Sequence, residues 1–409
     1  MTAASLAVTG LITAALLSAC AALAGLAARS RFARRLHHAM MIAGPIAGLV
    51  GAFVFLAWGV APLSLGASPL LFRAPLGVDR LSAFFLLLLH AVSLMASWFG
   101  ATYTEDEQDR YPLRLVLPVT AVFVFSMQGV LLSTGIASFL LFWEAMSLAA
   151  FFLVMADGEE GSRSAALLYL AIAQSGAGAL IVGCGIVGGG SLFATFATLR
   201  SSVDLLSPGH STLAAGLVVF AFASKAGLAP FHAWLPEAHP RAPSHVSALM
   251  SGAMLKVAVY GLLRFTSVCW PDLPAGWGVA LLALGLSGAA VAVIYANIAR
   301  DLKRILAWSS VENIGLVFAM FGFQLLLRRE GWPVLADAVM AAMFLQLLAH
   351  ALFKAGLFLG AGAIMHGAHT GKIELLGGLA NRMPQLSAGV LVLCLAAASL
   401  PPLDRKSVV

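Results

Sequence analysis

Long apolar runs recur along this chain, separated by short polar linkers that contain Gly, Pro and charged residues. A helix needs about 20 consecutive apolar residues to cross the hydrocarbon core of a bilayer. An Arg cluster follows the first run and no basic residue precedes it, which is the reverse of a signal peptide. The pattern therefore predicts an all-α fold, a polytopic membrane helix bundle. The runs predict twelve spans, at residues 3–27, 39–61, 81–100, 112–132, 135–156, 164–188, 211–229, 243–265, 276–297, 303–324, 335–362 and 386–403.

Composition supports a membrane protein and excludes several other classes. Of the 409 residues, 61% are hydrophobic and only 10% are charged, whereas an ordinary soluble domain carries about 25% charged residues. The net charge of +6 arises in short loops rather than on one basic face, so we expect no nucleic-acid partner. The four cysteines lie far apart and show no metal-ligand spacing. We therefore expect no catalytic site, cofactor or metal held by this chain alone.

The distribution of Lys and Arg over the predicted loops gives an orientation, because cytoplasmic loops carry an excess of basic residues. Thirteen Lys and Arg lie on the side of the first loop, and six lie on the opposite side. Lys303, at the start of the predicted span 303–324, is counted as a loop residue among the thirteen. The bias predicts that the N-terminus lies outside the cytoplasm.

The segment from Lys225 to Pro243 differs from the other linkers because it contains four prolines within fourteen residues. Each proline removes a backbone donor, so the segment cannot continue a regular helix. Freed backbone groups at membrane depth must be buried in protein or line a wet cavity, and broken helices in transporters place polar groups at such points. We interpret residues 225–243 as a broken helix at a functional site. The alternative is a re-entrant connector between two spans.

Ionisable residues inside the predicted spans are the main functional candidates, since a charge at the centre of a membrane helix costs about 2.5–3.5 kcal/mol on insertion scales. His350 and Lys354 are four residues apart, and His245 and Lys256 are eleven apart, so each pair shares one helix face. A row of titratable groups within a bundle is typical of a proton relay. The full set is Glu144, Lys225, Lys256, Glu312 and Lys354, joined by His90, His245 and His350.

A structural interpretation competes with this one at each position. Buried ion pairs can fix the register of helices, and a lone histidine such as His90 is more typical of a packing residue. His232, Glu237 and His239 flank the prolines and are candidates either for structural roles or for lining a proton access path. Glu312 is a further candidate for access or coupling. The candidate relay consists of Glu144, Lys225, His245, Lys256, His350 and Lys354.

Residues 224–256 carry a resemblance to a known family. They read Ser-Lys-Ala-Gly-Leu-Ala-Pro-Phe-His-Ala-Trp-Leu-Pro-Glu-Ala-His-Pro-Arg-Ala-Pro-Ser-His-Val-Ser-Ala-Leu-Met-Ser-Gly and continue to Lys256. With Phe-Trp-Glu at 142–144 and His-Ala-Leu-Phe-Lys at 350–354, the chain resembles the antiporter-like proton-channel subunits of complex I, multisubunit cation/proton antiporters and membrane-bound nickel–iron hydrogenases. The run Ser-Ser-Val-Glu-Asn-Ile-Gly at 309–315 is most similar to the hydrogenase-4 component B and formate hydrogenlyase branch.

This resemblance implies roles for the candidate residues. Glu144 and Lys225 would form a charge pair that controls one half-channel, and a nearby acid would hold that lysine charged. Moving the acid away would favour proton release. The remaining members would be the central groups and the second half of the relay, namely His245 and Lys256, and His350 and Lys354.

The resemblance also implies two inverted five-helix repeats, each with one broken helix. Residues 1–111 would be N-terminal transmembrane helices, 112–265 the first repeat with its break near 225–243, and 276–403 the second repeat. The family pattern continues beyond Leu-Pro-Pro-Leu with further helices, whereas this chain reads on to Asp-Arg-Lys-Ser-Val-Val. We therefore expect a C-terminally truncated second repeat, with 404–409 outside the family pattern.

The function implied is a proton-translocating membrane subunit of a hydrogenase-4 or formate hydrogenlyase type complex. Redox energy would come from other membrane and peripheral subunits, which would hold a [NiFe] centre and iron–sulfur clusters. The expected setting is the lipid bilayer of a bacterial or archaeal inner membrane. The alternatives are a cation/proton antiporter subunit, a proton-pumping subunit of an NADH-quinone oxidoreductase, and a non-transporting scaffold.

Overall fold

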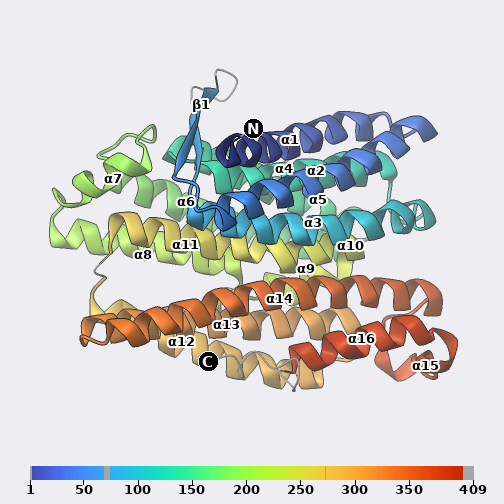
Figure 1. Ribbon diagram of the computed structural model, residues 1–409. Coiled ribbons are helices and arrows are strands. Elements are labelled where there is room, and N and C mark those ends of the chain that lie inside the picture. The colour runs from blue at the N-terminus through green and yellow to red at the C-terminus, as the bar shows by residue number, and fades with distance from the viewer. Residues whose placement is uncertain (1, 69–73, 272, 399–409) are drawn as a thin grey trace. The chain divides into compact units, whose positions relative to one another are not determined.

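The computed structural model describes residues 2–68, 74–271 and 273–398, which form long helices and one short β-hairpin (Figure 1). The chain divides into two compact units. Unit 1 comprises Met1–Lys225 and Lys256–Pro271, and unit 2 comprises Ala226–Leu255 and Asp272–Val409. In the described residues, ten helices are long and apolar enough to cross a membrane. The predicted all-α polytopic bundle is thereby confirmed.

Unit 1 contains the N-terminal helices and the hairpin. Polar side chains begin two of its helices, since Thr2 caps the first and Asp79 caps the third by accepting a bond from a backbone N–H of the first turn. Its elements are α1 (Ala3–Leu26), α2 (Arg31–Ala57), β1 (Leu63–Ser68), β2 (Ala74–Val78), α3 (Arg80–Asp106), α4 (Leu113–Leu132), α5 (Ile136–Val154), α6 (Glu160–Val187), α7 (Phe196–Val203), α8 (Pro208–Ala226) and α11 (Leu255–Cys269).

Unit 2 contains the proline-rich segment and the C-terminal helices. Helices α12 and α13 pack closely against each other, because glycines allow their two backbones to approach. A Cβ on Gly285 would overlap the backbone oxygen of Gly315. The elements are α9 (Trp234–Arg241), α10 (Ser244–Leu249), the π-helical turn η2 (Met250–Met254), α12 (Ala275–Ile298), α13 (Leu302–Arg329), α14 (Pro333–Ala368), the 3-10 turn η3 (Ile373–Leu375), α15 (Leu379–Arg382) and α16 (Pro384–Ala397).

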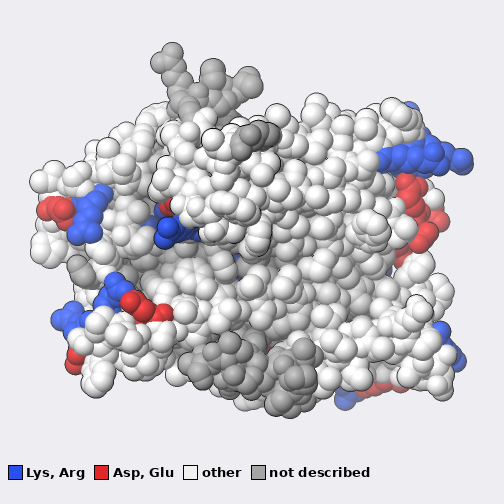
Figure 2. Space-filling model, viewed as in Figure 1, with Lys and Arg blue, Asp and Glu red and all other residues white. Residues whose placement is uncertain are grey.

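The ten helices coincide with ten of the twelve predicted spans. The prediction at 211–229 falls on α8, which is not among the ten. The prediction at 386–403 falls on the shorter helix α16, and its last residues, like the tail 404–409, lie outside the described residues. Charged side chains in the view of Figure 2 gather toward the helix ends, and the broad surface between them is uncharged. This pattern fits helices that cross a bilayer.

The hairpin between α2 and α3 was not predicted. Strands β1 and β2 pair antiparallel, with Leu63 opposite Val78 and an irregularity between Ser64 and Gly66. The segment shows no sustained alternation of apolar and polar residues, which is the usual signal of a strand. Its backbone also contacts the α4–α5 turn, where Thr134 N donates to the Pro75 carbonyl at 3.2 Å.

Candidate functional site

Lys225, at the end of α8, is bound by two hydroxyl groups from neighbouring helices of unit 1. Its Nζ donates to Ser147 Oγ of α5 at 2.6 Å and to Tyr169 OH of α6 at 2.9 Å. The lysine is only 2% exposed. An unpaired buried charge is costly, so these hydroxyls supply the polar environment that the apolar helices lack.

Two aromatic rings complete the surroundings of this lysine. Nζ lies 4.9 Å from the Tyr169 ring centre and 5.6 Å from that of Trp143, within the range of cation–π attraction. Helices α6 and α8 approach closely because Gly176 has no side chain, and a Cβ there would overlap the Ser224 hydroxyl. This close approach brings Tyr169 to Lys225.

Glu144 lies near Lys225 but does not contact it directly. The carboxylate is half-buried and accepts a hydrogen bond from Gln174 Nε2 at 2.8 Å. No ion pair joins Glu144 to Lys225 in the described part of the chain, although the carboxylate lies about one turn before Ser147, which binds the lysine. The implied charge pair is therefore indirect in this structure, and its role in a half-channel stays a prediction.

Ser147, Tyr169 and Gln174 were missed by the sequence analysis. Ser147 follows Glu144 by three residues, so their shared helix face was a usable signal. Tyr169 and Gln174 had no such signal, because they meet the site through packing of a different helix.

Lys256 is the second residue of α11, the helix that directly follows the π-helical turn η2, and is completely buried. Single π-helical turns are frequent at functional sites. In the most apolar stretch of the continuous helical run Ser244–Cys269, every residue is buried. In the equivalent stretch of α12, only 28% of the residues are buried. His245, at the other end of this run, is 3% exposed and belongs to unit 2.

In unit 2, a buried lysine of α14 packs against α13. Lys354 is completely buried, and its Nζ donates to the Leu306 carbonyl at 3.4 Å. His350 is also completely buried, one turn before Lys354, with its ring centre 5.5 Å from that of Phe353. His350 and Lys354 thus lie on one face of α14, as predicted, and this face is buried within unit 2.

The same face of α14 continues to Gln346, which the sequence analysis missed. Gln346 Nε2 donates to Asn313 Oδ1 of α13 at 2.7 Å. Glu312, the neighbouring candidate, is half-buried and accepts a bond from Ser309 at 3.4 Å. Asn313 rather than Glu312 therefore bonds to α14.

Lys303 is buried, contrary to its assignment as a loop residue. It is the second residue of α13, is 1% exposed, and donates to the Ala242 carbonyl at 2.8 Å. Helix α13 begins at Leu302, capped by Asp301, so the chain is already helical at this lysine. Lys303 thus binds a backbone carbonyl of the proline-rich segment.

The proline-rich segment interrupts helical structure between α8 and α9. Helix α8 ends at Ala226, and Gly227 follows with a φ of +76°, a conformation that favours glycine. His239 is completely buried and stacks on Phe358 with ring centres 4.8 Å apart. The description of 225–243 as the broken helix of a repeat stays a prediction, as does the division into repeats.

Two other residues flanking the prolines lie nearer the surface of unit 2. Glu237 is exposed and accepts two hydrogen bonds from Arg304, at 2.8 and 3.0 Å. His232 is half-buried, with its ring centre 5.2 Å from that of Trp308. Within the described residues, no group of three His, Cys, Asp or Glu lies together as a metal site would require.

The structure thus groups the candidates by unit. Unit 1 holds Glu144, Lys225 and Lys256, and His90 is buried there in α3. The histidines and the acid of the proline-rich segment, together with Glu312, lie in unit 2, as do His245, His350 and Lys354.

A family model and the sequences of known proteins both match this chain. The family model described as NADH:quinone oxidoreductase/Mrp antiporter, TM, matches residues 133–405. Hydrogenase-4 component B of Escherichia coli is 36% identical over 91% of this chain and 56% of its own length. Formate hydrogenlyase subunit 3 of the same organism is 30% identical over 89% of this chain and 58% of its own length. The chain thus spans little more than half the length of these relatives.

Solved structures share the fold. A chain of the Mrp complex from a Dietzia species superposes with a TM-score of 0.78 at 22% identity, covering 98% of this chain and 72% of its own length. A chain of an archaeal membrane-bound sulfane sulfur reductase gives a TM-score of 0.81 at 19% identity, covering 97% of this chain and 78% of its own length. The family model matches most of the sequence, and the identity to hydrogenase-4 component B extends over 91% of this chain. This chain belongs to the NADH:quinone oxidoreductase/Mrp antiporter family of transmembrane subunits.

Proposed function

We propose that this chain is a proton-translocating membrane subunit of a hydrogenase-4 or formate hydrogenlyase type complex. The identity to hydrogenase-4 component B and to formate hydrogenlyase subunit 3 supports this branch. The proposed location is a bacterial or archaeal inner membrane, with the N-terminus outside the cytoplasm. Partner subunits would carry the [NiFe] centre and iron–sulfur clusters and perform the electron transfer.

The observation that carries the proposal is the hydroxyl environment of Lys225. Ser147 and Tyr169 can accept hydrogen bonds from a charged ammonium and can donate to a neutral amine, because a hydroxyl is both donor and acceptor. A lysine clamped directly by a carboxylate would have to break an ion pair to release its proton. Among the described residues no carboxylate clamps Lys225, so both of its protonation states can be accommodated in place.

Proton transfer then proceeds through lysines that charge and discharge in turn. Glu144 lies about one turn before Ser147 on α5, and a nearby carboxylate favours the charged form of a lysine. Rearrangement of partner subunits during electron transfer would alter this electrostatic balance and release the proton toward the next group. Lys256 within unit 1, and His350 and Lys354 within unit 2, are the proposed further stations.

The test uses Lys225→Met in the assembled complex, with Lys372→Met as the matched control, because Lys372 is exposed. Proton uptake is measured in inverted membrane vesicles by quenching of a pH-sensitive acridine dye after addition of formate, with protons as the electron acceptor. Lys225→Met is expected to lower uptake at least about tenfold, or about 1.4 kcal/mol in the barrier. Equal uptake in both variants, with intact subunit composition, contradicts the proposal.

A second candidate function, gradient-driven antiport, is favoured by the identity to a probable K(+)/H(+) antiporter component of Rhizobium meliloti. That identity is 32% over 80% of this chain and 32% of the relative's length. The same vesicles distinguish the two functions. Proton movement driven by a sodium or potassium gradient without an electron donor supports antiport, whereas uptake that requires the donor supports the redox-coupled function.

A further inference from the structure

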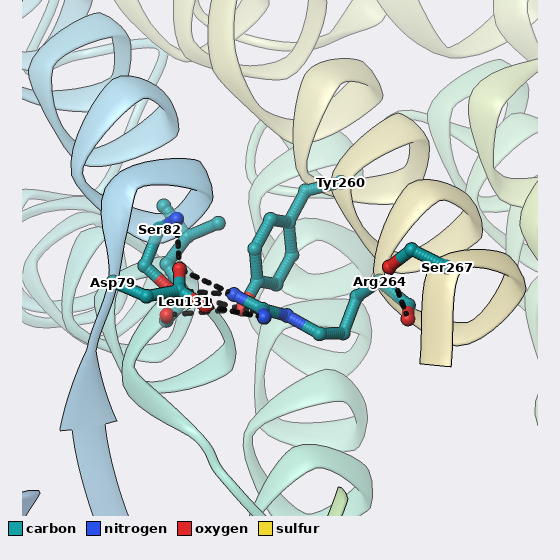
Figure 3. Close-up of polar contacts among 6 residues, drawn as sticks. All are labelled: Asp79, Ser82, Leu131, Tyr260, Arg264 and Ser267. Carbon is teal, nitrogen blue, oxygen red and sulfur yellow. Dashed lines mark hydrogen bonds and ion pairs between the residues drawn. The ribbon is translucent and has the colours of Figure 1, made fainter. Parts of the chain in front are cut away.

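A cluster of polar side chains in unit 1, outside the candidate relay, joins three helices at the end that carries the hairpin (Figure 3). Asp79 caps α3 by accepting from Ser82 N at 2.9 Å. The same carboxylate accepts two bonds from the Arg264 guanidinium of α11, at 2.5 and 2.7 Å. Arg264 also donates to Ser82 Oγ at 3.1 Å and, through Nε, to Tyr260 OH at 3.2 Å.

This cluster forms part of the wall of a pocket of about 440 Å³. Hairpin residues Leu63 and Gly77 and the turn residue Thr134 line the pocket together with Asp79 and Arg264. The pocket reaches the surface, since the Asp79 side chain is 31% exposed and that of Arg264 is 14% exposed. Tyr260, by contrast, is completely buried.

Arg264 and Tyr260 lie on the same face of α11 as Lys256. The three residues are spaced four apart, so each step along the face is about 6 Å and the whole row is about 12 Å long. Lys256 is completely buried at one end of this row, and Arg264 borders the open pocket at the other. The row therefore connects the pocket to the buried lysine along one face of α11.

The Tyr260 hydroxyl interrupts this route because its bonding capacity is used up. It donates its only proton to the Leu131 carbonyl at 3.2 Å, so it must accept from both Arg264 and Ser82, the latter at 3.1 Å. A hydroxyl has one proton and two accepting lone pairs. An arriving proton finds no free lone pair, and the Leu131 carbonyl cannot pass a proton onward.

The charge of Arg264 adds an electrostatic barrier at the same place. Burial raises the pKa of the Asp79 carboxyl, but the hydrogen bonds and charge of Arg264 outweigh this effect and lower the pKa overall. Asp79 therefore stays ionised and holds the guanidinium against the Tyr260 hydroxyl. The guanidinium binds the carboxylate through its terminal nitrogens and the Tyr260 hydroxyl through Nε, so a hydronium or metal cation that moves past Asp79 toward Tyr260 approaches the positive end of this ion pair.

We propose that Asp79, Ser82, Tyr260 and Arg264 form a seal that separates the hairpin-side pocket from Lys256 and prevents protons from leaking back along α11. The inference rests on the proposed function, because a seal matters only if Lys256 carries protons. Arg264 is the residue to test, since it carries the positive charge of the seal and binds all three other members, Asp79, Ser82 and Tyr260.

The experiment measures passive proton leak, without any electron donor, in liposomes that contain the purified complex. A potassium diffusion potential set by valinomycin drives protons inward, and an internal pH-sensitive dye reports their entry. Arg264→Gln removes the charge and is expected to raise the leak at least about tenfold. The repulsion between two nearby unit charges in a protein is large enough to account for a change of this size. Arg264→Lys keeps the charge and is expected to leak much less.

Two controls tie the leak to this route. Arg328→Gln removes an arginine whose ion pair with Asp337 is exposed, and it is expected to leave the leak at the wild-type level. The double variant Arg264→Gln, Lys256→Ala is expected to return to the wild-type level, because the route then lacks its buried proton acceptor. A leak that persists in the double variant overturns the connection to Lys256.

Assembly of each complex is checked by its subunit composition. Should Arg264→Gln fail to assemble, the double variant Asp79→Asn, Arg264→Gln removes both charges of the ion pair together, leaves neither unpaired and keeps an oxygen to cap α3. This double variant is then expected to leak, and a complex that assembles with it but does not leak overturns the seal. Because no donor is present, failure of redox-driven uptake leaves this result unaffected, so the two proposals fail separately.

Discussion

Two of the buried lysines, Lys225 and Lys354, lie in different units and in different surroundings. Lys225 donates to two side-chain hydroxyls and lies over two aromatic rings, with the Glu144 carboxylate about one turn before Ser147 on α5. Lys354 donates to a backbone carbonyl and lies near the ring of Phe353. A carbonyl only accepts hydrogen bonds, so it favours the charged amine, whereas hydroxyls serve the charged and neutral forms alike.

This difference indicates different roles for the two positions. The environment of Lys225 tolerates loss of a proton and is subject to control by a nearby acid. The Leu306 carbonyl favours a proton held on Lys354 until another group, such as His350 one turn away, exchanges with it. If both lysines belong to one relay, Lys225 is the controlled station and Lys354 the holding station.

The largest expected effect comes from Lys354→Arg. Arginine keeps the positive charge but cannot be deprotonated in a protein, so a station that must release a proton is blocked. Donor-driven uptake in inverted vesicles is expected to fall at least about tenfold. Normal uptake by an assembled Lys354→Arg complex would mean that only a fixed charge is needed in unit 2, and the relay would then be confined to unit 1.

A smaller effect is expected from Glu144→Gln, which removes the charge and keeps the side-chain volume. Because Glu144 acts on Lys225 without direct contact, uptake is expected to fall about fivefold, less than for loss of a lysine. Glu330→Gln, at an exposed position, is the matched control. A loss as complete as that of Lys225→Met would show that the acid is itself a proton carrier.

The smallest effect is expected from Tyr169→Phe. The change removes one of the two hydroxyls that bind Lys225 and keeps the ring beneath the ammonium. A hydrogen bond to a charged group is worth about 1.5–3 kcal/mol, and Ser147 retains part of it, so uptake is expected to fall about threefold. Tyr295→Phe, at a half-exposed ring, serves as the control. No change in Tyr169→Phe would leave Ser147 as the sole functional partner.

Most of the helices were predictable from the sequence because membrane insertion depends on local properties. A run of about 20 apolar residues suffices to span the bilayer regardless of what packs against it, and ten predicted spans coincide with helices. The candidate ionisable residues were found for the same reason, since a charge within such a run is visible without a structure. The hairpin was missed because its residues carry no alternating pattern.

Only the tertiary structure decided which groups surround each charge. Ser147 and Tyr169 lie 78 and 56 positions from Lys225, and Lys303 lies 61 positions from the carbonyl that it binds. Contacts of this kind depend on which helix faces meet and on close approaches such as that at Gly176. The sequence alone thus determined that charges are buried in a membrane bundle, because hydrophobicity is additive along a helix. Their partners depend on packing between distant segments, which no local pattern encodes.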